Sequence, residues 1–138
     1  HVLPSGGGGL YSTVPDFWRF AQMLLNGGEL DGVRVLGRKT VDLMSADALP
    51  AGTPVVVGNE QFHRGFGFGY GVAVMRNPAH NQIIGSAGEF YWEGGSNVYF
   101  WCDPEEDLVA VLMYQYRPGG GDWVYRRFKS LVYQALVD

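Results

Sequence analysis

The residues best placed to do chemistry are two neighbouring glycines, Gly94 and Gly95, which follow the aromatic run Phe90-Tyr91-Trp92. The aromatic run predicts a strand over about 89–93, and the glycines end that strand without covering its backbone. A substrate carbonyl can approach main-chain N–H groups closely at such a position. Backbone N–H groups aimed at a developing negative oxygen form an oxyanion hole. The pattern therefore predicts part of an acyl-transfer site.

An oxyanion hole needs a nucleophile, and the chain offers no convincing one. Its serines are Ser5, Ser12, Ser45, Ser86, Ser96 and Ser130, and none is followed by a lysine three residues later. Gly-x-Ser-x-Gly and His-Glu-x-x-His motifs are also absent, and His1, His63 and His80 fit no Ser/His/Asp pattern. We expect Cys102, in a predicted strand, to be a packing residue rather than a reactive thiol. The chain alone is therefore predicted to be inactive.

Composition limits the remaining possibilities. With 138 residues, 46% hydrophobic and 17% charged, the chain is one domain or a piece of one, and it can bury a core. The net charge is −4, and the basic cluster Arg126-Arg127-Lys129 is interpreted as the solvated face of a helix, so we expect no nucleic-acid partner. The spacing of Cys and His predicts no metal or cofactor. No apolar run reaches membrane-spanning length, so we expect a soluble protein.

The first part of the chain, residues 1–50, is predicted to be mainly helical. A glycine loop over 5–12 precedes a helix that Thr13 caps, with Pro15 in its first turn and Asp16 in the capping-box position. The helix ends at Asn26-Gly27-Gly28. A turn at Asp31-Gly32 and a short helix from about 38 to 45 follow, and then a loop over 46–64 in which 55–57 is briefly extended.

Antiparallel strands are predicted over 65–115. Glycines and larger side chains alternate through 65–76, which indicates one strand with a bare face that another element or a ligand can approach. We interpret 77–81 as a connection. Further strands are expected at 89–93, 97–102 and 108–115.

A final helix is predicted over 122–137, after a loop over 117–121. Asp122 is the expected cap, and the apolar positions of the helix form its predicted buried stripe. The stripe consists of Val124, Phe128, Leu131, Val132 and Ala135. Helices, a strand meander and a helix in this order give an α+β fold, an antiparallel sheet flanked by helices.

Several segments resemble the C-terminal part of the serine β-lactamase-like superfamily, which includes class C β-lactamases, β-lactamase-type esterases and DD-peptidase relatives. They are the glycine-rich run 6–13 with Asp16 and Phe20, the glycine-aromatic run 67–71, Phe100-Trp101-Cys102-Asp103-Pro104, and 108–115. The resemblance covers nearly all 138 residues, and it rests on the order and spacing of the segments. It implies that 1–138 is the C-terminal portion of a β-lactamase/transpeptidase-like fold.

The resemblance places Trp92-Glu93-Gly94 on the family's third motif, Lys-Thr-Gly in β-lactamases and often Trp-x-Gly or His-x-Gly in esterase-like members. The strand that holds this motif lines the active site, so Tyr91, Trp92, Glu93 and Gly94 are implied substrate-binding residues. The N–H of Gly95 is implied to be one of two oxyanion donors. A shift of one residue makes Gly94 and Gly95 the motif glycines and moves the donor by one position.

Two departures from the family pattern bear on the substrate. Trp92 stands where a cation would bind the carboxylate of a β-lactam, and Glu93 adds a negative charge where a small neutral residue is usual. Both argue against efficient penicillin hydrolysis and favour a neutral ester or amide held by aromatic side chains such as Tyr91 and Trp92. The alternative is that Trp92 and Glu93 are ordinary strand residues.

Two hypotheses follow from the sequence. In the first, the chain is part of a serine hydrolase that acts through an acyl-serine intermediate, with the nucleophile and base outside the chain. In the second, it is a non-catalytic module of the same fold that binds peptide or oligomerises at an open sheet edge. In the family the last strand pairs with N-terminal strands, so the edge at 108–115 is expected to bind the missing N-terminal segment or a second copy.

Overall fold

The computed structural model describes residues 6, 8–57, 60–62, 65–116 and 122–137. Its helices are α1 (Val14–Leu25), α2 (Arg38–Met44), α3 (Pro78–Asn81) and α4 (Asp122–Gln134). Its strands are β1 (Glu29–Leu30), β2 (Val33–Arg34), β3 (Val55–Val57), β4 (Glu60–Phe62), β5 (Phe66–Phe68), β6 (Ala73–Met75), β7 (Phe90–Gly94), β8 (Val98–Asp103) and β9 (Leu108–Met113). The mixture of helices and antiparallel sheets agrees with the expected α+β class.

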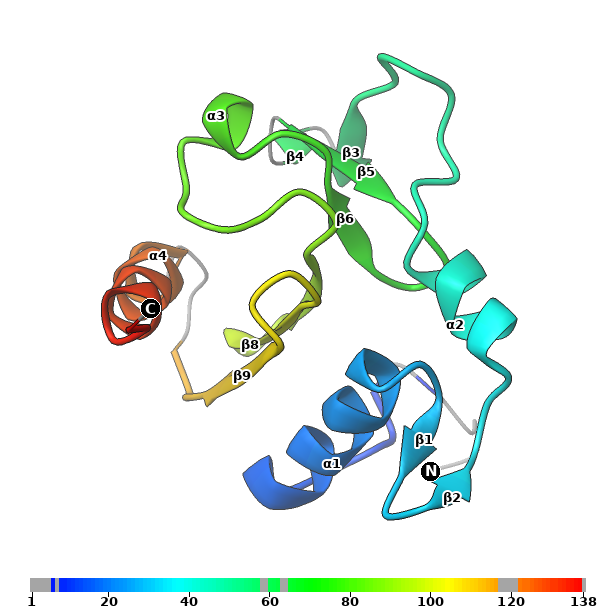
Figure 1. Ribbon diagram of the computed structural model, residues 1–138. Coiled ribbons are helices and arrows are strands. Elements are labelled where there is room, and N and C mark those ends of the chain that lie inside the picture. The colour runs from blue at the N-terminus through cyan, green and yellow to red at the C-terminus, as the bar shows by residue number, and fades with distance from the viewer. Residues whose placement is uncertain (1–5, 7, 58–59, 63–64, 117–121, 138) are drawn as a thin grey trace.

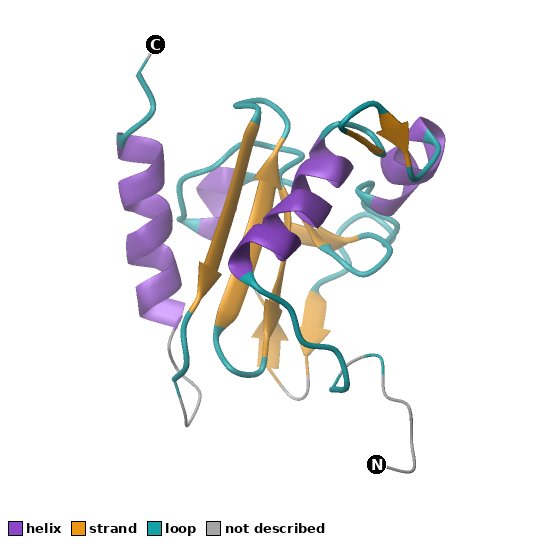
Figure 2. Ribbon diagram, turned by 90° about the horizontal axis from the view of Figure 1, so that it is seen from below, coloured by secondary structure: helices purple, strands orange, loops and turns teal. Residues whose placement is uncertain are grey.

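A five-stranded antiparallel sheet with the order β5-β6-β7-β8-β9 forms the centre of the molecule (Figure 1). Seen from below, α1 covers one face of this sheet and α4 lies against the other (Figure 2). Because side chains alternate along a strand, Phe90, Phe100 and Cys102 enter the core under α1, whereas Tyr91 and Trp101 enter the core under α4. The sheet is therefore buried on both sides.

The first helix begins and ends as its sequence predicts. The Thr13 hydroxyl accepts a hydrogen bond from the Asp16 N–H (3.3 Å) and donates one to the Asp16 carboxylate (2.8 Å). At the other end, the Gly28 N–H donates to the Met23 carbonyl at 2.8 Å, and Gly28 has a φ of 99°. Such positive φ values favour glycine after a helix. This arrangement leaves Ala21, fully buried, to contact the sheet.

The predicted strand over 65–76 is wrong, because the structure has two strands there, β5 and β6, joined by a turn. Gly71 has a φ of 87°, and the Gly69 N–H donates to the Val72 carbonyl at 2.8 Å. The alternation is therefore interrupted by a turn that glycine makes possible. The expected close approach is nevertheless present, since a Cβ on Gly67 would lie 2.1 Å from the Asp47 carboxylate.

Two connecting segments are more ordered than predicted. Asn77 caps the short helix α3 in the segment interpreted as a connection, and its side chain accepts a hydrogen bond from the Ala79 N–H at 2.9 Å. The extended run 55–57 is confirmed as β3, which pairs with β4 inside the predicted loop. The loop over 117–121 and parts of the loops over 5–12 and 46–64 lie outside the described residues, as do His1 and His63.

The buried face of α4 differs from the predicted stripe. Leu131 is 58% exposed and Ala135 is also exposed, whereas Tyr125 and Lys129 are buried. The basic cluster at 126–129 is therefore not wholly solvated, because Lys129 points into the core. Phe128 and Val132, which the sequence did assign to the stripe, pack against the core under α4.

Candidate functional site

The β7–β8 hairpin carries every residue that the sequence assigns to the site. The two strands pair from Phe90–Cys102 at the base to Gly94–Val98 at the tip. On the other side of β7, pairing with β6 is limited to the base, where Val74 lies opposite Phe90 and Ala73 opposite Tyr91. Strand β6 therefore borders only the first part of β7, and its pairing ends before the segment that contains Gly94.

The tip of the hairpin is a three-residue turn, Gly95-Ser96-Asn97. The Asn97 N–H donates to the Gly94 carbonyl at 2.9 Å, and Asn97 has a φ of 65°. A type I turn followed by a left-handed residue is a common three-residue hairpin connection. The Asn97 side-chain amide donates to the Tyr116 carbonyl at 2.6 Å, which connects the turn to the segment that follows β9.

The two glycines have different surroundings. A Cβ on Gly94 would lie 2.6 Å from Cγ2 of Val98, so a larger residue meets the neighbouring strand. Gly95 is exposed, and a Cβ there would meet no atom within 4 Å among the described residues. Gly95 also lies beyond the last pair of the β7–β8 ladder. Its main chain is therefore accessible at the tip.

The aromatic residues assigned to substrate binding do not share one surface. Trp92 is half-buried on β7, the middle strand of the sheet, and its ring lies edge-to-face with Phe68 at 5.0 Å. Tyr91 is fully buried on the α4 side, where its ring stacks on Tyr125 at 6.0 Å. Burial, and to a smaller extent the negative charge of half-buried Glu93, raises the pKa of Tyr91. The structure brings Trp92 and the glycines together and places Tyr91 in the core.

The serine and cysteine side chains show no activated nucleophile among the described residues. The hydroxyls of Ser45 and Ser130 donate to the carbonyls of Val41 and Arg126, one helical turn earlier. Cys102 is fully buried, and burial raises the pKa of its thiol. The expectation that Cys102 is a packing residue is confirmed.

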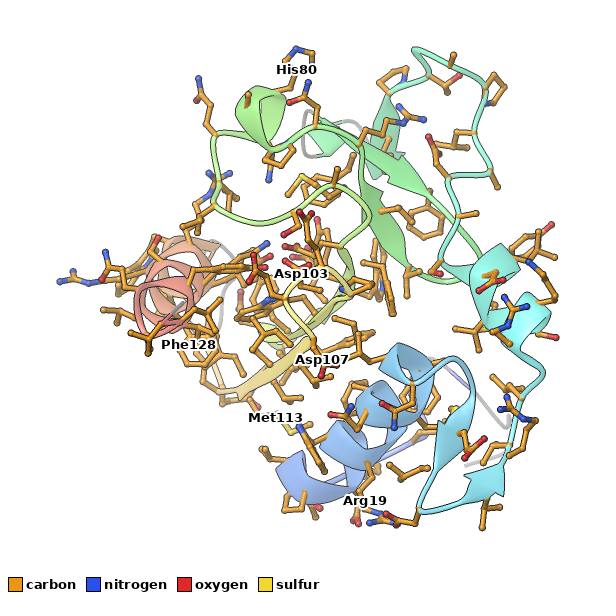
Figure 3. All side chains as sticks on the ribbon, in the orientation of Figure 1. Arg19, His80, Asp103, Asp107, Met113 and Phe128 are labelled. Carbon is orange, nitrogen blue, oxygen red and sulfur yellow. The ribbon has the colours of Figure 1, made fainter. Side chains whose placement is uncertain are left out.

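A buried polar cluster, which the sequence did not reveal, joins the base of the hairpin to α4. Glu89, Asp103 and Lys129 are all fully buried, and the Lys129 ammonium contacts the Glu89 carboxylate. The Tyr133 hydroxyl lies 2.5 Å from Oδ2 of Asp103 and 3.1 Å from Oε2 of Glu89. Figure 3 shows Asp103 in the interior near α4, whereas His80 lies at the periphery on α3.

Burial dominates the electrostatics of this cluster. It raises the pKa of Glu89 and lowers that of Lys129, and the attraction between the two groups opposes both shifts. The spacing Tyr125, Lys129, Tyr133, four residues apart, places all three on one face of α4. An aromatic residue one turn before and after a lysine was the signal that could have identified a buried cation.

A separate pocket of about 570 Å³ lies beside α3 and β5. Arg76 lines it, and its guanidinium donates to the Thr53 carbonyl at 2.8 Å and contacts the Asp47 carboxylate. The hydrogen bond from Arg76 holds the pKa of Asp47 below its usual value. Residues 91–95 do not line this pocket, so the hairpin tip and the pocket are distinct places.

Within the described ranges, no group of three or more His, Cys, Asp or Glu side chains could hold a metal ion. No helix in the part of the chain that the structure describes has the length and apolar character needed to cross a membrane.

Known structures share this architecture. The chain superposes on the hydrolase EstCE1, which has promiscuous acyltransferase activity, with a TM-score of 0.67, 21% identity, and coverage of 86% of this chain and 29% of that one. It superposes on a mutant of simvastatin synthase (LovD) from Aspergillus terreus with a TM-score of 0.54, 21% identity, and coverage of 81% and 30%. The chain therefore shares the fold of the corresponding part of these two proteins.

The sequence assigns the chain to a family. The β-lactamase family profile matches residues 2–134, and the chain belongs to this family. It is 36% identical over 133 residues to the uncharacterized protein MT1414 and to protein Rv1367c, both from Mycobacterium tuberculosis strains, with coverage of 86% of this chain. The match spans only 31% of each relative, so the chain corresponds to about a third of their length.

Proposed function

We propose that this chain is the substrate-side part of a β-lactamase-related serine hydrolase that acts on an ester or amide through an acyl-serine intermediate. The family assignment supports this proposal, and one structural neighbour, EstCE1, is described as a hydrolase with promiscuous acyltransferase activity. The nucleophilic serine and its base belong to a part of the protein outside this chain, because no serine here is followed by lysine at the required spacing. The protein would use no metal or other cofactor.

The observation that carries the proposal is the exposed main chain at the hairpin tip. Gly95 follows the last ladder pair, is accessible, and has open space beside its Cα. Gly95 itself has no side chain, and no described side chain lies beside its Cα, so we infer that a substrate carbonyl can reach the Gly95 N–H. We assign this N–H as one oxyanion donor, the second being the N–H of the nucleophilic serine.

The neighbouring residues would shape the substrate pocket. Trp92 and Gly94 would form its wall, and the negative charge of Glu93 would disfavour an anionic substrate. Tyr91 is fully buried, so its part in the proposal is to position the strand that carries Trp92. A neutral ester or amide fits this combination of aromatic surface and negative charge.

The test is a substitution that removes the N–H of Gly95 and preserves the turn. Gly95 occupies the second position of the Gly94–Asn97 turn, where proline is well tolerated. In a protein that includes the upstream region, we expect Gly95→Pro to lower kcat for a short-chain nitrophenyl ester by roughly 10²–10³, the usual cost of one lost oxyanion donor. Gly95→Ala, which keeps the N–H in open space, is the matched control.

Labelling with a fluorophosphonate tests the overall function, and it does so independently of the role of Gly95 as an oxyanion donor. The upstream-containing protein should be labelled and the 138-residue chain should not. Labelling of the isolated chain would contradict an external nucleophile, whereas equal activities of Gly95→Pro and Gly95→Ala would contradict only the role of Gly95.

A second function is suggested by the outer edge of β9. In the described part of the sheet, β8 is the strand neighbour of β9, and β9 is the last strand in the order. Unpaired edges recruit further strands. We propose that the missing N-terminal segment pairs here in the whole protein, and that the isolated chain associates with a second copy or a peptide instead.

Molar-mass measurements over a range of concentrations test this edge. We expect the 138-residue chain to self-associate and the upstream-containing protein to be monomeric. A monomeric isolated chain that also binds no upstream segment added in trans would contradict the proposal.

A further inference from the structure

The buried cluster at the hairpin base contains more ionisable groups than one ion pair explains. Glu89 directly precedes β7, Asp103 ends β8, and Lys129 and Tyr133 belong to α4. All three charged residues have 0% exposure. Two carboxyl groups and one ammonium would leave an uncompensated negative charge in the core if every group were ionised, and an unpaired buried charge is strongly disfavoured.

Burial lowers the pKa of Lys129, but the groups that contact its ammonium oppose this effect and favour the charged form. Its ammonium lies 5.6 Å from the Trp101 ring, 5.9 Å from the Tyr125 ring and 5.7 Å from the Tyr133 ring. Aromatic faces at this distance attract a cation. The ammonium also contacts the Glu89 carboxyl group directly. The positive charge is therefore retained, and charge balance must be achieved at the carboxyl groups.

The hydrogen-bond geometry gives an independent count of the protons held by the two carboxyl groups. The Tyr133 hydroxyl lies within hydrogen-bond distance of one oxygen of Glu89 and one of Asp103, but it has a single proton to donate. The second contact is favourable only if that carboxyl group carries a proton and donates it to the tyrosine oxygen. The remaining contacts need acceptors, since Lys129 donates to Oε1 of Glu89 and the Glu105 N–H donates to Oδ1 of Asp103 at 3.1 Å.

We propose that Glu89 and Asp103 share one bound proton at neutral pH, so that the cluster formed with Lys129 and Tyr133 is electrically neutral and fixes α4 to the base of the β7–β8 hairpin. The proton is assigned to the pair and not to one residue, because the Tyr133 hydroxyl contacts both carboxyl groups. Its loss would leave a net negative charge in the core between the sheet and α4. The cluster is thus a pH-sensitive attachment for α4.

Among the other charged groups of α4, half-buried Arg126 acts on Tyr125 but is not among the groups that shift the pKa of Glu89. Tyr91 from β7 and Tyr125 from α4 are both buried phenols whose pKa values are raised by burial, so they stay neutral. The Cys102 thiol on β8 is kept neutral in the same way. The negative charge of Glu93, the next carboxylate along β7, raises the pKa values of Tyr91 and Tyr125 further.

The shared proton determines whether the stability of the fold rises or falls with pH. Glutamate in the unfolded chain loses its proton near pH 4.3, whereas burial raises the pKa of Glu89 in the fold. Above about pH 4.3 the folded protein therefore binds more protons than the unfolded chain, and its stability falls as pH rises. The decrease ends once the pH exceeds the raised pKa of Glu89 in the folded protein.

Carbon NMR of the unmodified protein, selectively labelled at Glu or Asp carboxyl carbons, tests the proton count directly. At pH 7 we expect one buried carboxyl signal, from either residue type, with the chemical shift of a protonated acid. That signal should move to the carboxylate position on raising the pH. Two ionised carboxylates at pH 7, or two protonated acids, would overturn the proposal.

The pH dependence of unfolding by urea provides the second test. Glu89→Gln and Asp103→Asn each replace a carboxyl group with a neutral amide that can donate to Tyr133. We expect the residue that holds the proton to tolerate its substitution and the alkaline decrease in stability to disappear in that variant. Glu106→Gln, at an exposed position in the β8–β9 turn, is the control that should keep the wild-type pH profile. An unchanged pH profile in both core variants would also overturn the proposal.

Discussion

The two ends of the β7–β8 hairpin use opposite chemistry. At the base, Glu89 and Asp103 are fully buried and are joined to Lys129 and Tyr133 of α4. At the tip, Gly95 carries no side chain and is exposed. One end is held by ionic and hydrogen-bonding partners on a neighbouring helix, whereas the other presents bare backbone.

This difference suggests that the two ends of the hairpin have separate roles. Buried polar clusters tolerate little rearrangement, because each unsatisfied group is costly. The base therefore fixes the direction of β7 and β8, and the tip can remain open while its position is still determined by the ladder below it. A site that needs a positioned N–H group benefits from such support. The following predictions test whether the two ends are as different as the structure indicates.

The largest effect is expected at the base. Lys129→Met keeps much of the side-chain volume but leaves the buried carboxyl groups without their cation. We expect the free energy of unfolding to fall by about 3–5 kcal/mol, the usual cost of removing one partner of a buried pair. Urea unfolding at neutral pH measures the change.

A matched control is Arg127→Met, two residues before Lys129 and on the exposed side of α4. It removes the same charge from the surface and should change stability by less than about 0.5 kcal/mol. Similar losses in the two variants would show that the cluster at the base contributes no more than a surface charge.

At the tip, the larger of the expected effects belongs to Gly94. A Cβ at this position would lie 2.6 Å from Cγ2 of Val98, and the branched valine has few alternative rotamers. We expect Gly94→Ala to destabilise the protein by about 1–3 kcal/mol through overpacking. The double variant Gly94→Ala with Val98→Ala should recover part of this loss of stability. If the double-mutant cycle shows no recovery, the predicted clash between the two side chains is excluded.

The sequence predicted the tip better than the base for a physical reason. Turn chemistry is local, so the aromatic run and the glycines at 94–95 were sufficient to predict a strand and a reversal. The base depends on contacts between residues far apart in the chain, such as Glu89 with Lys129, forty residues later. In the sequence, a lysine close to two arginines is interpreted as part of a solvated basic cluster unless the partner that buries the lysine is known.

The same distinction explains the misassigned strand over 65–76. Its alternation of glycines and larger residues was correctly recognised, but a period of two does not reveal a reversal. The turn at Gly69–Val72 depends partly on α2, because the Tyr70 N–H donates to the Met44 carbonyl at 2.9 Å. The position of Tyr91 within the core was hidden for a similar reason, since α4 buries it from a distant part of the sequence.

An intermediate effect is expected where the tip meets β9. Asn97→Ala removes the hydrogen bond to the Tyr116 carbonyl and places alanine at a φ of 65°, so we expect a loss of about 1–2 kcal/mol. Asn97→Gly loses the same hydrogen bond but accepts the backbone conformation, and should therefore cost less. Equal losses measured by thermal unfolding would show that the backbone conformation contributes nothing.

The smallest effect on stability is expected at Gly95, even though its proposed role in catalysis is large. Open space beside its Cα accepts the methyl group of Gly95→Ala, and the second position of the turn accepts the ring of Gly95→Pro. Both variants should remain within about 0.5 kcal/mol of the wild type in urea unfolding. Their stabilities should match while their esterase activities differ in the upstream-containing protein, because only proline removes the N–H. A large loss of stability in the proline variant alone would mean that this N–H holds the fold, and the contrast between a supporting base and an open tip would then fail.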